Sequence, residues 1–262
     1  MWFRKSNFHK KVSIMYSLYA NVMNETEKMW KRRRTIVFLM LTLLIPVLSA
    51  VMLSSVQNAG VFGGLGGSLP MLMLSLFTVS LLPLFLFITA ADSFSGEEAA
   101  RTMKLILVRP ITRAKAFSSK VLAMAFYIGV QLATLWLVSV LAGWFAPGGG
   151  MTGSLADSIK AYAAAFVPMF AIGLIAAFIA QCFGSSSGAM ALTICIYAAA
   201  KVLPFFFPFL SVWSVFSYTN WYVLWIGKAA SVSKLFNTFV LLFSYSIMAY
   251  TGGWLLFERK QL

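Results

Sequence analysis

The side chains with the greatest capacity for chemistry are concentrated in one charged segment, residues 92–120, which lies between two apolar runs. This segment holds three of the seven acidic residues and six of the twenty-one basic ones. A segment that gathers charge of both signs between uncharged runs is typical of a surface that docks a partner. What docks there is the functional question that the sequence poses.

Residues for catalysis and metal binding are scarce. His9 is the only histidine, and Cys182 and Cys195 both fall inside apolar runs. Zinc sites and histidine-dependent catalysis therefore lack their ligands, and no disulfide framework is indicated. The Gly-rich stretch 57–69 lacks the Lys-Ser/Thr that follows a phosphate-binding loop. We expect no cofactor and no enzymatic activity in this chain, and any ATP would be bound by another polypeptide.

A few polar side chains lie within the apolar runs, where burial of charge is costly and indicates function. Lys201 falls near the middle of its run, just before Pro204 and Pro208. It either donates to carbonyls that the prolines free or lines a polar path or a dimer interface. Gln131 and Gln181 are explained as well by hydrogen bonds between helices. We take Gln131 and Lys201 as candidates for lining a path.

The elements that position these residues are membrane helices. The chain is 60% hydrophobic and 11% charged, whereas about a quarter of the residues of a soluble domain are charged. A helix needs about 20 apolar residues to cross a bilayer. Six runs meet that length: 35–56, 70–91, 121–146, 161–183, 189–210 and 235–257. We predict an all-α membrane protein of one domain, residues 1–262.

The distribution of basic residues predicts the orientation. With the N-terminus inside and six spans, the inner segments carry seventeen Lys and Arg and the outer loops carry three. This asymmetry follows the positive-inside rule and places both termini in the cytoplasm. The net charge of +14 therefore reflects topology and contact with anionic lipid rather than binding of nucleic acid.

Two segments outside the spans have a pattern of their own. Residues 1–34 contain apolar residues at spacings of three and four with a basic opposite face, which predicts an amphipathic helix in the membrane interface. Residues 211–234 are rich in aromatic residues, which prefer the headgroup level. This outer segment is either an aromatic belt or a partly re-entrant gate, and its candidate gate residues are Trp213, Trp221 and Trp225.

Within the charged segment, Ser95 followed by Glu98 predicts a helix N-terminus. The new helix would end near Pro110, with Glu97 facing water and pairing with Arg101. Such a helix would lie flat beneath the membrane and be attached to two spans.

The string GEEAARTMKLILVRPITRAKAFSSK resembles the signature loop of the type-2 class of ATP-binding-cassette permeases. Glu97, Thr102, Pro110, Arg113 and Lys120 fall at matching positions, whereas residues 101 and 119, Arg and Ser here, are usually Gly. The layout of an amphipathic N-terminal helix, six spans and an aromatic outer segment is also similar to that family.

The resemblance implies that residues 92–120 form a coupling helix in a groove of a separate ATPase subunit, which binds ATP and Mg. It implies a second permease copy or paralogue as partner, and a bacterial cytoplasmic membrane. The candidate coupling residues are Glu97, Glu98, Arg101, Thr102, Lys104, Pro110 and Arg113.

The expected function is ATP-driven export of an amphipathic cargo, since the spans offer an apolar path with few charges. The main alternative is a regulatory or sensing subunit whose ATP cycle controls another process. A lipid-modifying enzyme would need a carboxylate cluster or a histidine at membrane depth, and Asp92 alone does not supply one. An ion-driven carrier would need paired acidic residues in mid-span.

Overall fold

The fold is known from a computed structural model, which describes residues 18–58, 68–100, 112–145, 154–226 and 232–259. Every regular element in these ranges is a helix. Six helices among the described residues are long and apolar enough to cross a bilayer. They are α2 (Arg33–Asn58), the continuous helix Leu69–Ala99, α7 (Arg113–Phe145), α8 (Leu155–Gln181), α9 (Ser186–Phe206) and α12 (Val232–Arg259). The predicted all-α class with six spans is therefore confirmed.

The second span is longer than its apolar run and is not uniform. It consists of α3 (Leu69–Leu76), a π-helical turn η1 (Phe77–Leu81), α4 (Leu82–Ala91), a second π-helical turn η2 (Asp92–Gly96) and α5 (Glu97–Ala99). A π turn seats an extra residue within a helix and is frequently found at functional sites. The second of these turns falls on the first residues of the charged segment.

The predicted helix N-terminus at Ser95 is wrong, because Ser95 lies inside η2 rather than before a new helix. Its side chain is fully buried, and its Oγ donates a hydrogen bond to the carbonyl of Ala180 at 2.5 Å. A chain in an apolar environment keeps its backbone hydrogen bonds by staying helical. The same continuity starts α7 at Arg113, eight residues before the predicted third span.

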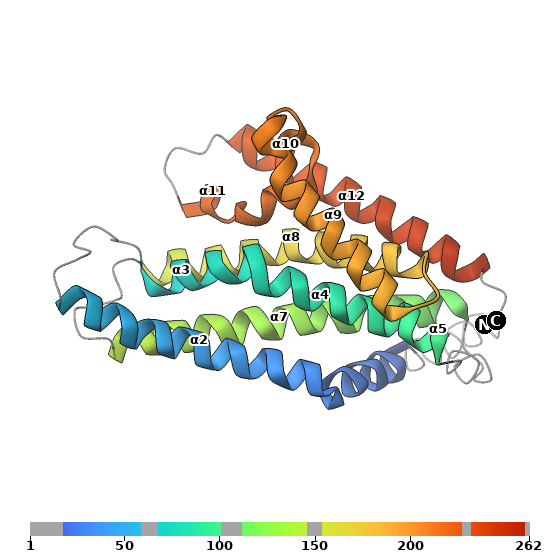
Figure 1. Cartoon of the computed structure of the whole chain (residues 1–262), viewed down its shortest axis with the longest axis horizontal. Helices are drawn as coiled ribbons and strands as arrows, with labels where there is room; N and C mark the ends of the chain where they lie inside the picture. The colour runs from blue at the N-terminus through green and yellow to red at the C-terminus, as the bar shows by residue number, and fades with distance from the viewer. Residues whose placement is uncertain (1–17, 59–67, 101–111, 146–153, 227–231, 260–262) are drawn as a thin grey trace, which may run out of the picture.

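Helix α8 forms the centre of the bundle. Figure 1 shows it between the pair α3–α4 and α7 on one side and α9 and α12 on the other. Its most apolar stretch is 61% buried, against 17% for α9 and for α12 and 22% for α2. Small side chains allow this close approach, and the buried alanines of α8 include Ala161, Ala165, Ala171, Ala176, Ala177 and Ala180. The three outer helices therefore present wide apolar faces outward.

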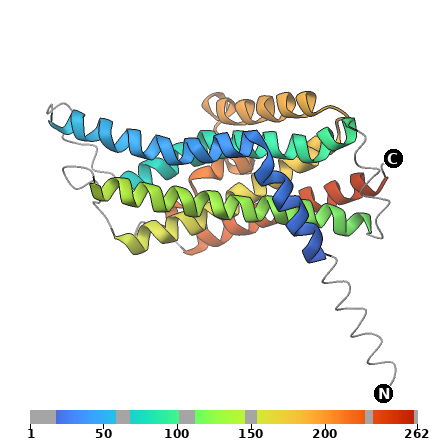
Figure 2. The ribbon, with the colours of Figure 1, turned by 90° about the horizontal axis from the view of Figure 1, so that it is seen from below.

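The described part of the N-terminal segment, residues 18–31, is helical and ends at a bend at Arg32. Figure 2 shows this helix crossing α7 at an angle to α2. Met29 is buried against Tyr127 of α7, whereas Tyr19 and Met23 stay exposed. One part of the predicted apolar face thus packs on protein. Residues 1–17 lie outside the described ranges, and the placement of this helix in a membrane interface stays a prediction.

The predicted aromatic segment folds back over one end of the bundle. It consists of α10 (Leu210–Trp213), a 3₁₀ helix η3 (Val215–Asn220) and α11 (Val223–Ile226). Val215, Phe216 and Trp221 are buried in the main core beside α8 and α9. We call this the aromatic end of the bundle, and we call the opposite end, with residues 18–34, 92–100, 113–120 and 186, the charged end.

Candidate functional site

A buried lysine is the centre of the charged end. Lys120 lies two turns into α7, and only 1% of its side chain is exposed. Its Nζ donates hydrogen bonds to Glu97 Oε2 of α5 at 2.6 Å and to Glu25 Oε2 of the N-terminal helix at 2.9 Å. One ammonium thus joins the third span, the end of the second span and the N-terminal helix.

A second junction lies at Asp92, the first residue of η2. Arg34 Nη1 at the start of α2 donates to Asp92 Oδ2 at 2.9 Å. Ser186 Oγ, the first residue of α9, donates to Asp92 Oδ1 at 2.7 Å. This carboxylate therefore ties the first, second and fifth spans together at the charged end.

Two cations connect the junctions into one network. Arg32 lies 3.8 Å from Asp92 and 3.9 Å from Glu97, and Lys28 lies 3.7 Å from Glu97. We call the network the charge cluster. It consists of Glu25, Lys28, Arg32, Arg34, Asp92, Glu97 and Lys120. Buried ions are stabilising only when they are mutually compensated, so removal of one member leaves its partners in a costly state.

The electrostatics of the charge cluster are visible at Glu25. Burial raises the pKa of this carboxyl, and the charges and hydrogen bonds of Lys120 and Lys28 outweigh burial, so its pKa lies below the ordinary value. Glu25 therefore stays ionised at neutral pH and keeps the N-terminal helix bound to α7.

The predicted coupling residues that the structure describes differ in their burial and in their partners. Glu97 was expected to face water and pair with Arg101, but it is buried against Lys120. Its direction follows from the π turn before it, which shifts the helix face. Glu98 is half-buried, and Arg113 donates to the carbonyl of Glu258 at 2.7 Å, near the end of α12. The remaining four candidates, Arg101, Thr102, Lys104 and Pro110, lie outside the described residues.

The sequence analysis missed the role of Glu25, Arg32 and Asp92 in this site. The cations beside Asp92 are Arg34 of α2 and Arg32 at the bend before that helix. A signal was present, because Glu25 and Glu27 are the only acidic residues in the first ninety-one. The contact of Glu25 with Lys120 could not be read from sequence, since the two residues are 95 positions apart.

The two polar candidates within the spans make contacts between elements. Gln131 of α7 is buried and donates from Nε2 to Thr42 Oγ1 of α2. Lys201 of α9 donates to Thr219 Oγ1 of η3 at 2.8 Å and lies over the Tyr197 ring. The hydrogen bond of Lys201 goes to a side chain, whereas one sequence interpretation had it bonded to carbonyls freed by the prolines. A role of either residue in lining a path stays a prediction.

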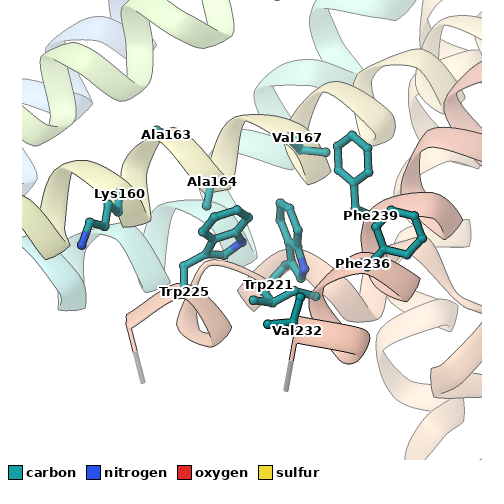
Figure 3. A pocket seen from close by; sticks show the side chains of 10 residues that line it. Lys160, Ala163, Ala164, Val167, Trp221, Trp225, Val232, Phe236 and Phe239 are labelled. Atoms are coloured by element: carbon teal, nitrogen blue, oxygen red, sulfur yellow. The ribbon is translucent and has the colours of Figure 1, made fainter. Parts of the chain in front are cut away.

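The three predicted gate tryptophans have different environments. Trp221 is buried, with 3% exposure, whereas Trp213 and Trp225 are 67% and 46% exposed. Trp221 and Trp225 border an apolar hollow of about 650 Å³ between α8, α11 and the first turns of α12. Figure 3 shows their rings beside Phe236 and Phe239, with Lys160 of α8 at one end of the row.

Comparison with known families decides the identity of the chain. The sequence pattern described as "ABC-2 family transporter protein" matches residues 22–201, more than half of the length. The chain belongs to the ABC-2 transporter family. A comparison with curated proteins found no match. The resemblance inferred from residues 96–120 is thus confirmed.

Membership of the ABC-2 family sets the broad role of this chain. It is a multi-pass membrane protein and the permease component of an ABC transporter. ABC-2 membrane proteins are not themselves the ATPase, and the family implies association with an ABC ATPase subunit.

The part of the chain that matches the ABC-2 family includes the whole charge cluster. Residues 22–201 contain every member of the charge cluster, from Glu25 to Lys120, and also Ser186. The aromatic segment and α12 lie beyond the match. Among the described residues, no group of three or more His, Cys, Asp or Glu side chains is placed to hold a metal.

Proposed function

We propose that this ABC-2 permease is the membrane half of an ATP-driven exporter and that the charge cluster transmits the movement of a separate ATPase subunit to the spans. The observation that carries the proposal is the Lys120 junction. The segment between residues 100 and 113 joins α5 to α7, and Lys120 links those same two helices and the N-terminal helix. A push on this segment would therefore act on three elements at once.

The charged end is cytoplasmic in this proposal. The inner segments are the basic ones, as the positive-inside rule requires, and an ATPase with its ATP and Mg can dock only on that side. The protein would reside in a bacterial cytoplasmic membrane with both termini inside. The function of the chain is then to shift between inward and outward forms that the nucleotide state of the partner biases.

A second permease copy is part of the proposal. Helix α9 has an apolar face that is largely exposed in the single chain, and it carries the half-buried Lys201. Because a lysine at membrane depth is costly against lipid, a helix that carries one is better placed beside protein or a path than among acyl chains alone. Cargo would be amphipathic, since aromatic and apolar side chains dominate the exposed faces.

The first test is purification of the chain from its native cells in mild detergent, with mass spectrometry of the soluble subunit that co-purifies. A stoichiometric ATPase is the expected result. Recovery of the intact, folded chain without such a subunit would contradict the proposal.

Coupling is then tested in the reconstituted complex. Glu98→Lys and Arg113→Glu should leave membrane insertion intact and abolish the response of ATPase activity to cargo. Glu27→Lys is the matched control, because Glu27 is exposed and pairs only with its neighbour Lys31 among the described residues. Unchanged coupling in the first two variants would exclude them as coupling residues. Glu97→Lys is unsuitable, since its burial makes it a test of folding.

Transport is measured separately from ATP hydrolysis. Flux of an amphipathic cargo into inverted vesicles, dependent on ATP, supports export. A cargo-responsive ATPase without any flux would instead favour the regulatory or sensing subunit.

A further inference from the structure

The apolar hollow at the aromatic end is not used by the coupling mechanism. It extends along α8 from Lys160 to Val167, a rise of about 10 Å at 1.5 Å per residue. Its volume of about 650 Å³ lies in the range of small-molecule sites. One side is formed by small side chains such as Ala164, and the other by the rings of Trp221, Trp225 and Phe239 (Figure 3).

Trp221, which lines the hollow, holds a buried hydrogen-bond donor that has no partner among the described residues. Trp221 is 3% exposed, and its Nε1 has no acceptor among the described residues. An indole nitrogen can only donate, and buried donors are nearly always paired in native proteins. The occupant of the hollow should therefore be largely apolar and carry an acceptor oxygen at the level of this ring.

The end of the hollow carries charges of both signs. Lys160 Nζ lies 3.3 Å from Asp157 Oδ1, and both side chains are well exposed. Figure 3 shows the Lys160 ammonium directed away from the tryptophan rings. A paired ammonium and carboxylate beside an apolar hollow complement a headgroup that is itself a zwitterion, with its phosphate at Lys160 and its ammonium at Asp157.

We propose that this hollow binds one phospholipid with a zwitterionic, hydrogen-bonding headgroup such as phosphoethanolamine. Its phosphate contacts Lys160, its ammonium contacts Asp157, an ester carbonyl accepts from Trp221 Nε1, and an acyl chain lies between α8 and α12. The order of these groups along α8 is the order of headgroup, ester and tail along the bilayer normal. Tryptophan rings at the level of the ester match their preference for the membrane interface.

The test is native mass spectrometry of the intact chain, purified in mild detergent and exposed to an equimolar mixture of three lipids. The lipids are phosphatidylethanolamine, phosphatidylglycerol and phosphatidylcholine with identical acyl chains. We expect one phosphatidylethanolamine per chain, preferred by about tenfold over the other two, as one charge-assisted hydrogen bond would provide. Phosphatidylglycerol lacks the ammonium, and the quaternary ammonium of phosphatidylcholine cannot donate to Asp157.

Three variants test the individual contacts. Lys160→Gln should weaken retention of phosphatidylethanolamine about tenfold, and Asp157→Asn should abolish the preference over phosphatidylglycerol. Both residues are exposed, so folding should be unaffected. Ala164→Leu fills the hollow and should prevent retention, whereas Ala198→Leu on the exposed face of α9 should not.

Equal retention of the three lipids, or a preference for phosphatidylglycerol, would overturn the headgroup assignment. Wild-type retention in folded Ala164→Leu would overturn the location. A native single-chain amphiphile in place of the phospholipid would identify a cargo site and likewise overturn the proposal. The experiment needs neither ATP nor a partner subunit, so its result is independent of the coupling mechanism.

Discussion

Lys120 is the residue whose loss we expect to damage the charged end most, because two carboxylates share its ammonium. Glu25 and Glu97 would remain buried without their principal counter-charge, although Lys28 and Arg32 lie nearby. Leaving a buried charge uncompensated is more costly than replacing a whole ion pair by apolar groups.

We predict that Lys120→Met lowers the free energy of unfolding by about 3 kcal/mol. Thermal unfolding of the purified chain in detergent measures this change. Lys115→Met is the matched control on the same helix, since Lys115 is only half-buried and should cost little. Equal melting temperatures for the two variants would show that the Lys120 ion pairs do not stabilise the fold.

The pH dependence of stability should report Glu25. Because its pKa in the folded chain lies below the ordinary value of about 4.5, its contribution is fully present above that pH. The contribution is lost as the pH falls through the lower, folded value. We predict a declining melting temperature below about pH 4.5, with a shallower decline in Glu25→Gln. An identical slope in both proteins would contradict this assignment.

At the scale of elements, close packing of α12 on α7 depends on the missing side chain of Gly253. A Cβ at Gly253 would lie 3.0 Å from Phe117 Cζ and 3.4 Å from Gln181 Nε2. Both neighbours are held in place, Phe117 in the buried core and Gln181 at the end of α8. The helices can therefore approach only because residue 253 is glycine.

We predict that Gly253→Val separates α12 from α7 and lowers the melting temperature, with loss of about 1–3 kcal/mol from overpacking. Gly129→Ala is the control, because a Cβ there meets no atom within 4 Å. That change should be neutral or stabilising, since alanine favours helix more than glycine does. The prediction fails if the two variants unfold at the same temperature.

At the scale of the whole molecule, the single chain leaves three helices mostly uncovered. Of these, α9 carries the half-buried Lys201, which lies five residues before the end of the helix at Phe206 and whose exposure to lipid would be unfavourable. We therefore expect α9 rather than α2 or α12 to face a second copy. The chain contains a natural reporter, because Cys195 lies exposed on α9.

We predict that a short thiol-to-thiol cross-linker applied to native membranes yields a dimer through Cys195. The experiment uses Cys182→Ser, so that Cys195 is the remaining thiol, and denaturing electrophoresis detects the product. Cys195→Ser retains the exposed Cys182 at the charged end and serves as the control. A dimer that survives in the control and is missing from Cys182→Ser would move the interface away from α9.

The sequence predicted the parts of this molecule that depend on local composition. The six spans and the aromatic segment follow from long apolar runs and from interfacial residue types. The sequence did not predict contacts between residues that are far apart in the chain. No local pattern indicates that Asp92 pairs with Arg34 or that Glu97 pairs with Lys120. The sequence prediction also failed at Ser95, because a capping pattern takes no account of the bilayer, which favours continuing the helix.

The two π turns of the second span change the direction in which its side chains point around the helix axis. Each accommodates one residue more than an α turn, which rotates all later side chains by about 100° relative to an uninterrupted helix. By Glu97 the accumulated offset is roughly 200°, so no single helical wheel describes Leu69–Ala99. The side of the second span that faces a given neighbour at one end is therefore not the side that faces the same direction at the other end. An insertion or deletion within Phe77–Leu81 or Asp92–Gly96 would rotate the side chains at the charged end to other directions. The side chains at the aromatic end, which precede both turns, would keep their directions.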